Sequence, residues 1–218
     1  MEASLRRDQG HLPEALKLLE QALSVDNGEE RKKLLLNRTN ILELTGDSEE
    51  AISALWELEP LISDETEPRL LWILYFTLIN NLLHVERPEE AQAILSKTRE
   101  MALRLGNELD IRRTCWLEAR VAARLGRREE ALLILSRVRE YFIAQGMAYD
   151  VALVLLDLAI LHYEEGQIEE VRILVGQMAP IFKAQGTHRE ALAALRLSRG
   201  ASEGEAVLML LGPWLMPQ

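Results

Sequence analysis

The sequence predicts an all-α fold, a right-handed superhelical solenoid of antiparallel helix pairs with about twelve helices. Three observations predict it. One short motif recurs along nearly the whole chain at a fixed spacing, and a second set of glycines lies midway between its copies. The segments between these points carry apolar residues at helical intervals.

Each copy of the motif is a turn residue followed, four and five positions later, by an acidic and a small residue. The copies lie 36 residues apart once and then 40 residues apart three times. A small side chain is expected where two antiparallel helices cross closely, because a larger one would overpack the crossing. The turn residues are Gly10, Gly46, Glu86, Gly126 and Gly166, and the small residues are Ala15, Ala51, Ala91, Ala131 and Val171.

The interleaved glycines are Gly106, Gly146 and Gly186, again 40 residues apart. Glycine is favoured where a helix ends and the backbone takes a left-handed conformation. Pro68 and Pro88 fall where helices would begin, at positions that need no backbone N–H. Each 40-residue unit is therefore predicted to be a helix, a turn, a second helix and a second turn.

These boundaries predict one solenoid domain over residues 1–218. It comprises a partial N-terminal repeat (1–26), four full repeats (27–66, 67–106, 107–146 and 147–186) and a C-terminal capping segment (187–218). The first repeat is short, so we expect either a fragment of a longer protein or a helical stub that closes the stack. The apolar tail around 206–211 is expected either to cap the last repeat or to form a homodimer contact through an exposed solenoid end.

Composition excludes several function classes. The net charge of −10 argues against direct binding of nucleic acid or of an anionic membrane surface. A single cysteine, Cys115, excludes an intrachain disulfide and a cysteine-built zinc site. No apolar run reaches the roughly 18–20 residues that span a bilayer, and the first ten residues lack a signal-peptide core. The expected compartment is the cytoplasm.

The sequence shows no arrangement typical of a catalytic, cofactor or metal site. A glycine-rich phosphate loop is missing, and none of the four histidines is paired with another three or four positions away. Arg112 and Arg113 beside Cys115 would lower a thiol pKa, but a buried inert thiol is the favoured interpretation. We therefore predict no enzyme activity, no cofactor and no metal.

The pairs Gly46–Ala51 and Gly126–Ala131 resemble the tetratricopeptide family, whose helix-turn-helix unit has Gly at the turn and Ala five residues later. The resemblance extends over nearly the whole sequence. A 40-residue unit is longer than the family's usual length of about 34 residues. It is similar to longer-repeat bacterial relatives, found in sensory halves of transcription regulators and in peptide receptors. Cys115 and Leu155 replace the family's aromatic residue in the first helix.

The resemblance implies that the first helix of each repeat lines a concave groove. Counting back from each turn residue yields four residues per repeat. They are Lys33, Asn37, Asn40 and Glu43, then Ile73, Phe76, Asn80 and His84, then Arg113, Trp116, Arg120 and Arg124, and finally Leu153, Leu156, Ile160 and Tyr163.

The third of these sets is the most specific candidate. Its members lie at i, i+3, i+7 and i+11 and so share one helix face. Arginines beside a tryptophan bind carboxylates and stack on rings, which makes an acidic peptide segment or the terminal carboxylate of a polypeptide the expected ligand. The alternative is a solvated charged face around a half-buried tryptophan.

Some family members bind a terminal carboxylate with a Lys–Asn pair, a second Asn and two further basic residues. Lys33, Asn37 and Arg113 match this pattern, whereas Thr77 and Leu117 depart from it. The leading hypothesis is a scaffold or adaptor that binds a peptide or protein segment in the groove. The alternative is a ligand- or peptide-sensing domain of a larger bacterial regulator.

Overall fold

The computed structural model describes residues 12–25 and 30–185. These residues form nine α-helices and one short 3-10 helix, without strands, so the predicted all-α helical repeat is confirmed. The count of described helices is nine rather than about twelve. The three other expected helices, one before Gly10 and two after Gly186, lie outside the described residues, as do the ends through which a dimer was expected.

The chain divides into two compact units, Met1–Gly106 and Asn107–Gln218. This boundary coincides with the predicted boundary between two 40-residue repeats. The first unit contains α2 (Leu12–Val25), α3 (Glu30–Thr45), α4 (Ser48–Leu58), η1 (Glu59–Leu61), α5 (Pro68–His84) and α6 (Pro88–Leu105). The second contains α7 (Glu108–Arg124), α8 (Arg128–Ala144), α9 (Ala148–Glu164) and α10 (Ile168–Gln185).

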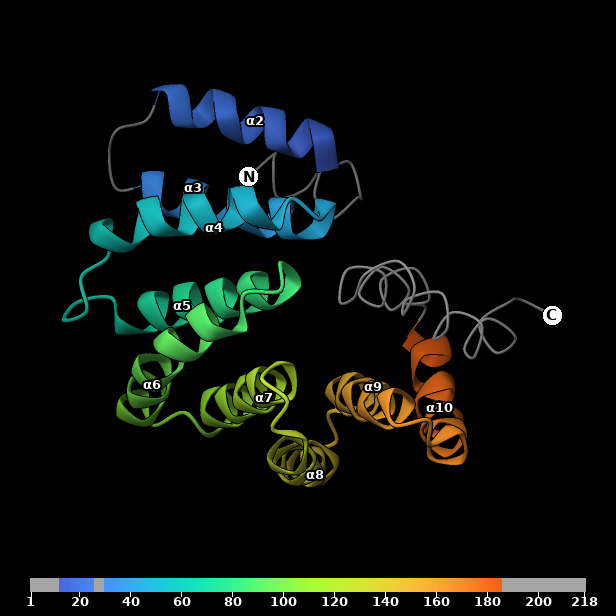
Figure 1. The fold of residues 1–218 in the computed structure, drawn as a ribbon. Helices are drawn as coiled ribbons and strands as arrows, with labels where there is room; N and C mark the ends of the chain where they lie inside the picture. The colour runs from blue at the N-terminus through green and yellow to red at the C-terminus, as the bar shows by residue number, and fades with distance from the viewer. Residues whose placement is uncertain (1–11, 26–29, 186–218) are drawn as a thin grey trace. The chain divides into compact units, whose positions relative to one another are not determined.

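Within each unit, every helix packs against its neighbours in sequence (Figure 1). In the second unit α7 also contacts α9, the first helix of the next repeat. Pro68 and Pro88 begin α5 and α6, as predicted from the sequence. Among the described helices, none is both long and apolar enough to cross a membrane.

Four of the five predicted turn residues adopt the conformation that the motif requires, and Gly10 lies outside the described residues. Gly46, Gly126 and Gly166 have φ angles of 88°, 74° and 68°. Glu86, which replaces glycine in the third copy of the motif, has a φ of 56°. A side chain in this left-handed region is strained, because its Cβ approaches the following carbonyl oxygen.

The small residue of every motif copy is buried. Ala15, Ala51, Ala91 and Ala131 are 0% exposed, and Val171 is 1% exposed. This is the environment expected at a close helix crossing. The α9 helix is buried more completely than its neighbour α7 because it packs between α8 and α10 and also contacts α7.

Candidate functional site

The basic stripe predicted from the sequence lies on α7. Arg113, Trp116, Arg120 and Arg124 are each partly buried and partly accessible. The structure places two carboxylates of α9, Asp150 and Asp157, against it. We refer to Arg113, Trp116, Arg120, Asp150 and Asp157 as the α7–α9 surface.

Trp116 joins the apolar core to the polar part of this surface. Its indole Nε1 donates a hydrogen bond of 2.6 Å to Asp157 Oδ2. Its ring meets the buried Phe142 edge to face, with the ring centroids 5.9 Å apart. The ring is therefore held on two sides, by the core and by a carboxylate, which sets its orientation on the surface.

Two loose ion pairs flank the tryptophan. Arg113 Nη2 lies 3.6 Å from Asp150 Oδ1, and Arg120 Nε lies 3.9 Å from Asp157 Oδ2. Both pairs join residues 37 positions apart in sequence, which is close to one repeat. The carboxylates offset the positive charge of the arginines, so the stripe attracts an acidic ligand less strongly than its own sequence predicts.

Asp157 is a surface residue that the sequence reasoning missed. Two signals point to it in retrospect. It lies about one repeat beyond Arg120, and it lies seven positions after Asp150 on the same helix face. Neither signal singles it out without the crossing geometry of α7 and α9.

The four residues of α9 that were predicted to line the groove differ in how deeply they are buried. Ile160 is 2% exposed and belongs to the core of the second unit, so its side chain does not line a surface. Leu156 is likewise buried. Leu153 and Tyr163 are only partly buried and pack on the edge of that core.

The predicted residues of the first unit lie on α3 and α5. Lys33 is exposed and pairs with Glu30 of its own helix at 2.9 Å. Asn37 and Asn40 are partly buried on α3, and His84 is partly buried at the end of α5.

Two further residues of α5 mainly serve packing. Phe76 packs against Trp72, with ring centroids 5.3 Å apart. Asn80 is buried and donates a hydrogen bond to the Phe76 carbonyl within the same helix. These two residues are therefore less available to a ligand than the sequence indicates.

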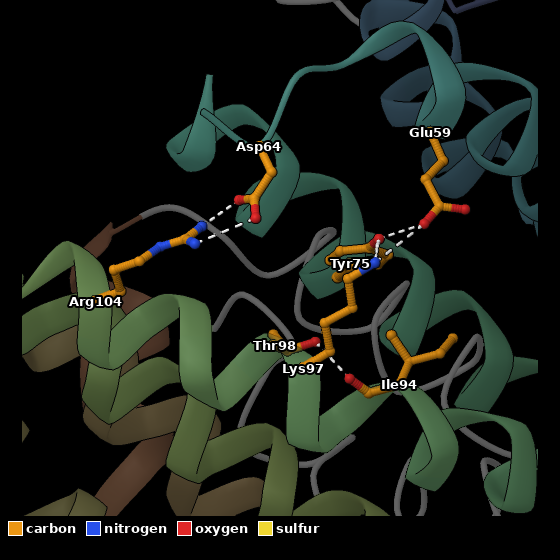
Figure 2. Close-up of polar contacts among 7 residues, drawn as sticks. All are labelled: Glu59, Asp64, Tyr75, Ile94, Lys97, Thr98 and Arg104. Atoms are coloured by element: carbon orange, nitrogen blue, oxygen red, sulfur yellow. Dashed lines mark hydrogen bonds and ion pairs between the residues drawn. The ribbon is translucent and has the colours of Figure 1, made fainter. Parts of the chain in front are cut away.

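The first unit also contains a polar cluster that the sequence reasoning did not identify (Figure 2). The hydroxyl of the buried Tyr75 on α5 donates to Glu59 of η1 and accepts from Lys97 of α6. Arg104 of α6 pairs with Asp64 in the loop before α5. Lys97 and Arg104 of α6 thus each reach an acidic residue about one repeat earlier, a spacing that is visible in the sequence.

The contacts within the cluster raise the pKa of two of its groups. Burial, followed by the hydrogen bond to Glu59, raises the pKa of Tyr75. The hydrogen bond to Tyr75 raises the pKa of Lys97. Both groups therefore keep their protons at neutral pH, so neither is in the unprotonated form that a general base needs there. Among the described residues, no group of three His, Cys, Asp or Glu could hold a metal ion.

Comparison with known proteins identifies the fold. No family model matches the sequence, and no curated protein matches it either. A solved Rap protein, in complex with Competence and Sporulation Factor, matches with a TM-score of 0.73 and 14% identity over 98% of this chain. This chain spans 60% of the length of that Rap protein.

A second solved structure, BtubC (BKLC) from P. vanneervenii, matches with a TM-score of 0.58 and 14% identity. The match covers 96% of this chain and 87% of the BtubC chain. Similarity at this level of identity establishes a shared helical-repeat fold. It agrees with the tetratricopeptide-like architecture that the motif predicts.

Proposed function

We propose that this protein binds a peptide or protein segment, and that the α7–α9 surface is where it does so. The observation that carries the proposal is the set of five polar or aromatic side chains from two adjacent first helices, all partly accessible, with Trp116 held in a set orientation. The similarity in fold to a Rap protein that holds Competence and Sporulation Factor supports the same class of ligand.

The proposal does not require an acidic ligand. Asp150 and Asp157 lie beside the arginines and would repel a second carboxylate placed there. We further propose that the protein acts as a scaffold or adaptor without catalysis, and that it is located in the bacterial cytoplasm. The second candidate role, a peptide-sensing domain of a larger regulator, uses the same surface and the same class of ligand.

The test is a selection of random dodecapeptides on the whole protein, followed by fluorescence-polarisation titration of the enriched peptides. We expect at least one peptide whose affinity falls tenfold or more with Arg113→Ala or Trp116→Ala. Arg137→Ala is the matched control, because Arg137 is exposed on α8 of the same unit. Failure to enrich any peptide would contradict the function. Enriched peptides that bind all three variants equally would contradict the surface.

A sensing role predicts one further result. A sensor must couple binding to a change in population between conformations, so hydrogen exchange should change in helices that the peptide does not touch. An adaptor is expected to show protection on α7 and α9 alone. Exchange measured by mass spectrometry with the selected peptide distinguishes the two roles.

A further inference from the structure

Arg113 and Asp150 lie side by side but are too far apart to form a hydrogen bond. Their 3.6 Å separation exceeds the usual length of a hydrogen bond, about 2.7–3.2 Å. The two side chains are 38% and 17% exposed. Among the described residues, this contact is the one polar interaction of either side chain. Solvent or a ligand can therefore reach a guanidinium donor and a carboxylate acceptor that lie next to each other.

A peptide main chain offers the complementary pair of groups. In an extended segment, the N–H and the C=O of one residue point to roughly the same side, as they do when two strands exchange hydrogen bonds. The guanidinium can donate to that C=O while the carboxylate accepts from that N–H, and both bonds are strengthened by the charge on the protein group. The peptide unit is neutral, so it avoids the repulsion that an acidic side chain would meet from Asp150.

A second arginine–aspartate pair lies two helical turns further along α7 and α9. Arg120 and Asp157 each lie seven residues after their counterparts in the first pair, on the same two helices. Seven residues of α-helix advance about 10.5 Å. Asp157 accepts from Trp116 at Oδ2, and a carboxylate has two oxygens that accept. The second pair can therefore receive a main-chain N–H as the first does.

The distance between the two arginine–aspartate pairs determines which extended conformation of the ligand can contact both of them. Three residues of a polyproline II segment advance about 9.3 Å, and the threefold repeat of that helix turns residues i and i+3 to the same side. In a β-strand, residues on the same side are two or four apart. An extended ligand that meets both pairs is therefore of the polyproline II type, and it crosses Trp116 between them.

We infer that the α7–α9 surface recognises the main chain of a polyproline II-type peptide segment through Arg113–Asp150 and Arg120–Asp157, at ligand residues three apart. The inference rests on the proposed function and adds to it the means of recognition. Specificity for the charge of ligand side chains is then weak, because the charged groups of the protein are used on the peptide backbone.

The test uses a dodecapeptide selected on the whole protein, resynthesised with a single N-methyl group at each position in turn. N-methylation removes one main-chain N–H and leaves the side chains unchanged. We expect two sensitive positions, three residues apart, at each of which the affinity falls about tenfold or more. An alanine scan of the acidic and basic side chains of the same peptide is expected to change the affinity less than threefold.

Protein variants then assign each sensitive position to one pair. Asp150→Ala should abolish the effect of N-methylation at one position and leave the effect at the other. Asp157→Ala should do the reverse. The Asp150 variant is expected to fold, since its side chain forms only a loose ion pair, so the assignment remains possible even if the Asp157 variant is unstable.

The possible outcomes separate the two proposals. A selected peptide whose affinity follows its charged side chains, or whose sensitive positions are unaffected by Asp150→Ala, overturns this inference while peptide binding stands. Sensitive positions two or four apart overturn the polyproline II conformation. If no peptide is enriched, the proposed function fails, and the inference fails with it.

Discussion

Trp116 of α7 donates its indole N–H to Asp157 of α9 at 2.6 Å, across 41 positions of sequence. The bond joins the first helices of two successive repeats on the accessible side of the second unit. It therefore links the stability of that unit to the geometry of the surface that we propose for peptide binding.

The first prediction concerns this bond. Trp116→Phe should lower the free energy of unfolding by about 1–3 kcal/mol, because a hydrogen bond to a charged acceptor is lost. A double-mutant cycle with Asp157→Ala should give a coupling of about 1 kcal/mol. Urea denaturation followed by circular dichroism measures both. Trp56→Phe is the control, since Trp56 is 41% exposed, and its expected change is under about 0.5 kcal/mol. Zero coupling would contradict the assignment.

The second prediction concerns the turn at Glu86. Glu86→Gly should raise the free energy of unfolding by about 1 kcal/mol, because it relieves a left-handed backbone at φ 56°. Gly126→Ala at the equivalent turn should lower it by about 1 kcal/mol, because φ there is 74° and alanine would be strained. Thermal and urea denaturation of the two variants should shift in opposite directions. Shifts of the same sign would show that the turns are not equivalent.

The third prediction concerns the close helix crossing at Ala131, which is fully buried. Ala131→Leu should destabilise the protein by about 1–3 kcal/mol through overpacking. Ala131→Val should cost less, because the equivalent position 40 residues later is Val171 and is also buried. Ala144→Leu, at an exposed position of the same helix, is the control and should change stability by under about 0.5 kcal/mol.

The fourth prediction is a loss of stability in alkali that depends on Tyr75 and Lys97. Both pKa values are raised above their ordinary values of 10.0 and 10.5, Tyr75 mainly by burial and Lys97 mainly by its hydrogen bond to Tyr75. A group with a raised pKa in the folded state contributes stability below its unfolded pKa and loses that contribution as pH rises through the folded value. The free energy of unfolding should therefore fall more steeply above pH 10 in the parent protein than in Tyr75→Phe.

The measurement is urea denaturation at intervals from pH 8 to pH 11. Arg137→Ala, an exposed position outside the cluster, should leave the slope unchanged. Identical slopes in the parent and in Tyr75→Phe would contradict the linkage.

The sequence by itself determined the repeating architecture. Within the described residues, the turn residues at their 40-residue spacing, the small residue five positions later, and Pro68 and Pro88 at helix starts reappear in the structure as predicted. These features are local, or depend only on the next helix in sequence. Backbone sterics, the missing N–H of proline and the limited volume at a helix crossing act on them directly, so a periodic pattern is enough to identify them.

The tertiary structure alone decided which side chains meet. Helical periodicity placed Arg113 and Arg120 on one face, but it could not pair them with Asp150 and Asp157. Nor could it separate the buried Ile160 from the accessible Tyr163. The physical reason is that the period of a helix sets the angle between its own residues, whereas the rotation of each helix against its neighbours follows from the packing of all of them together.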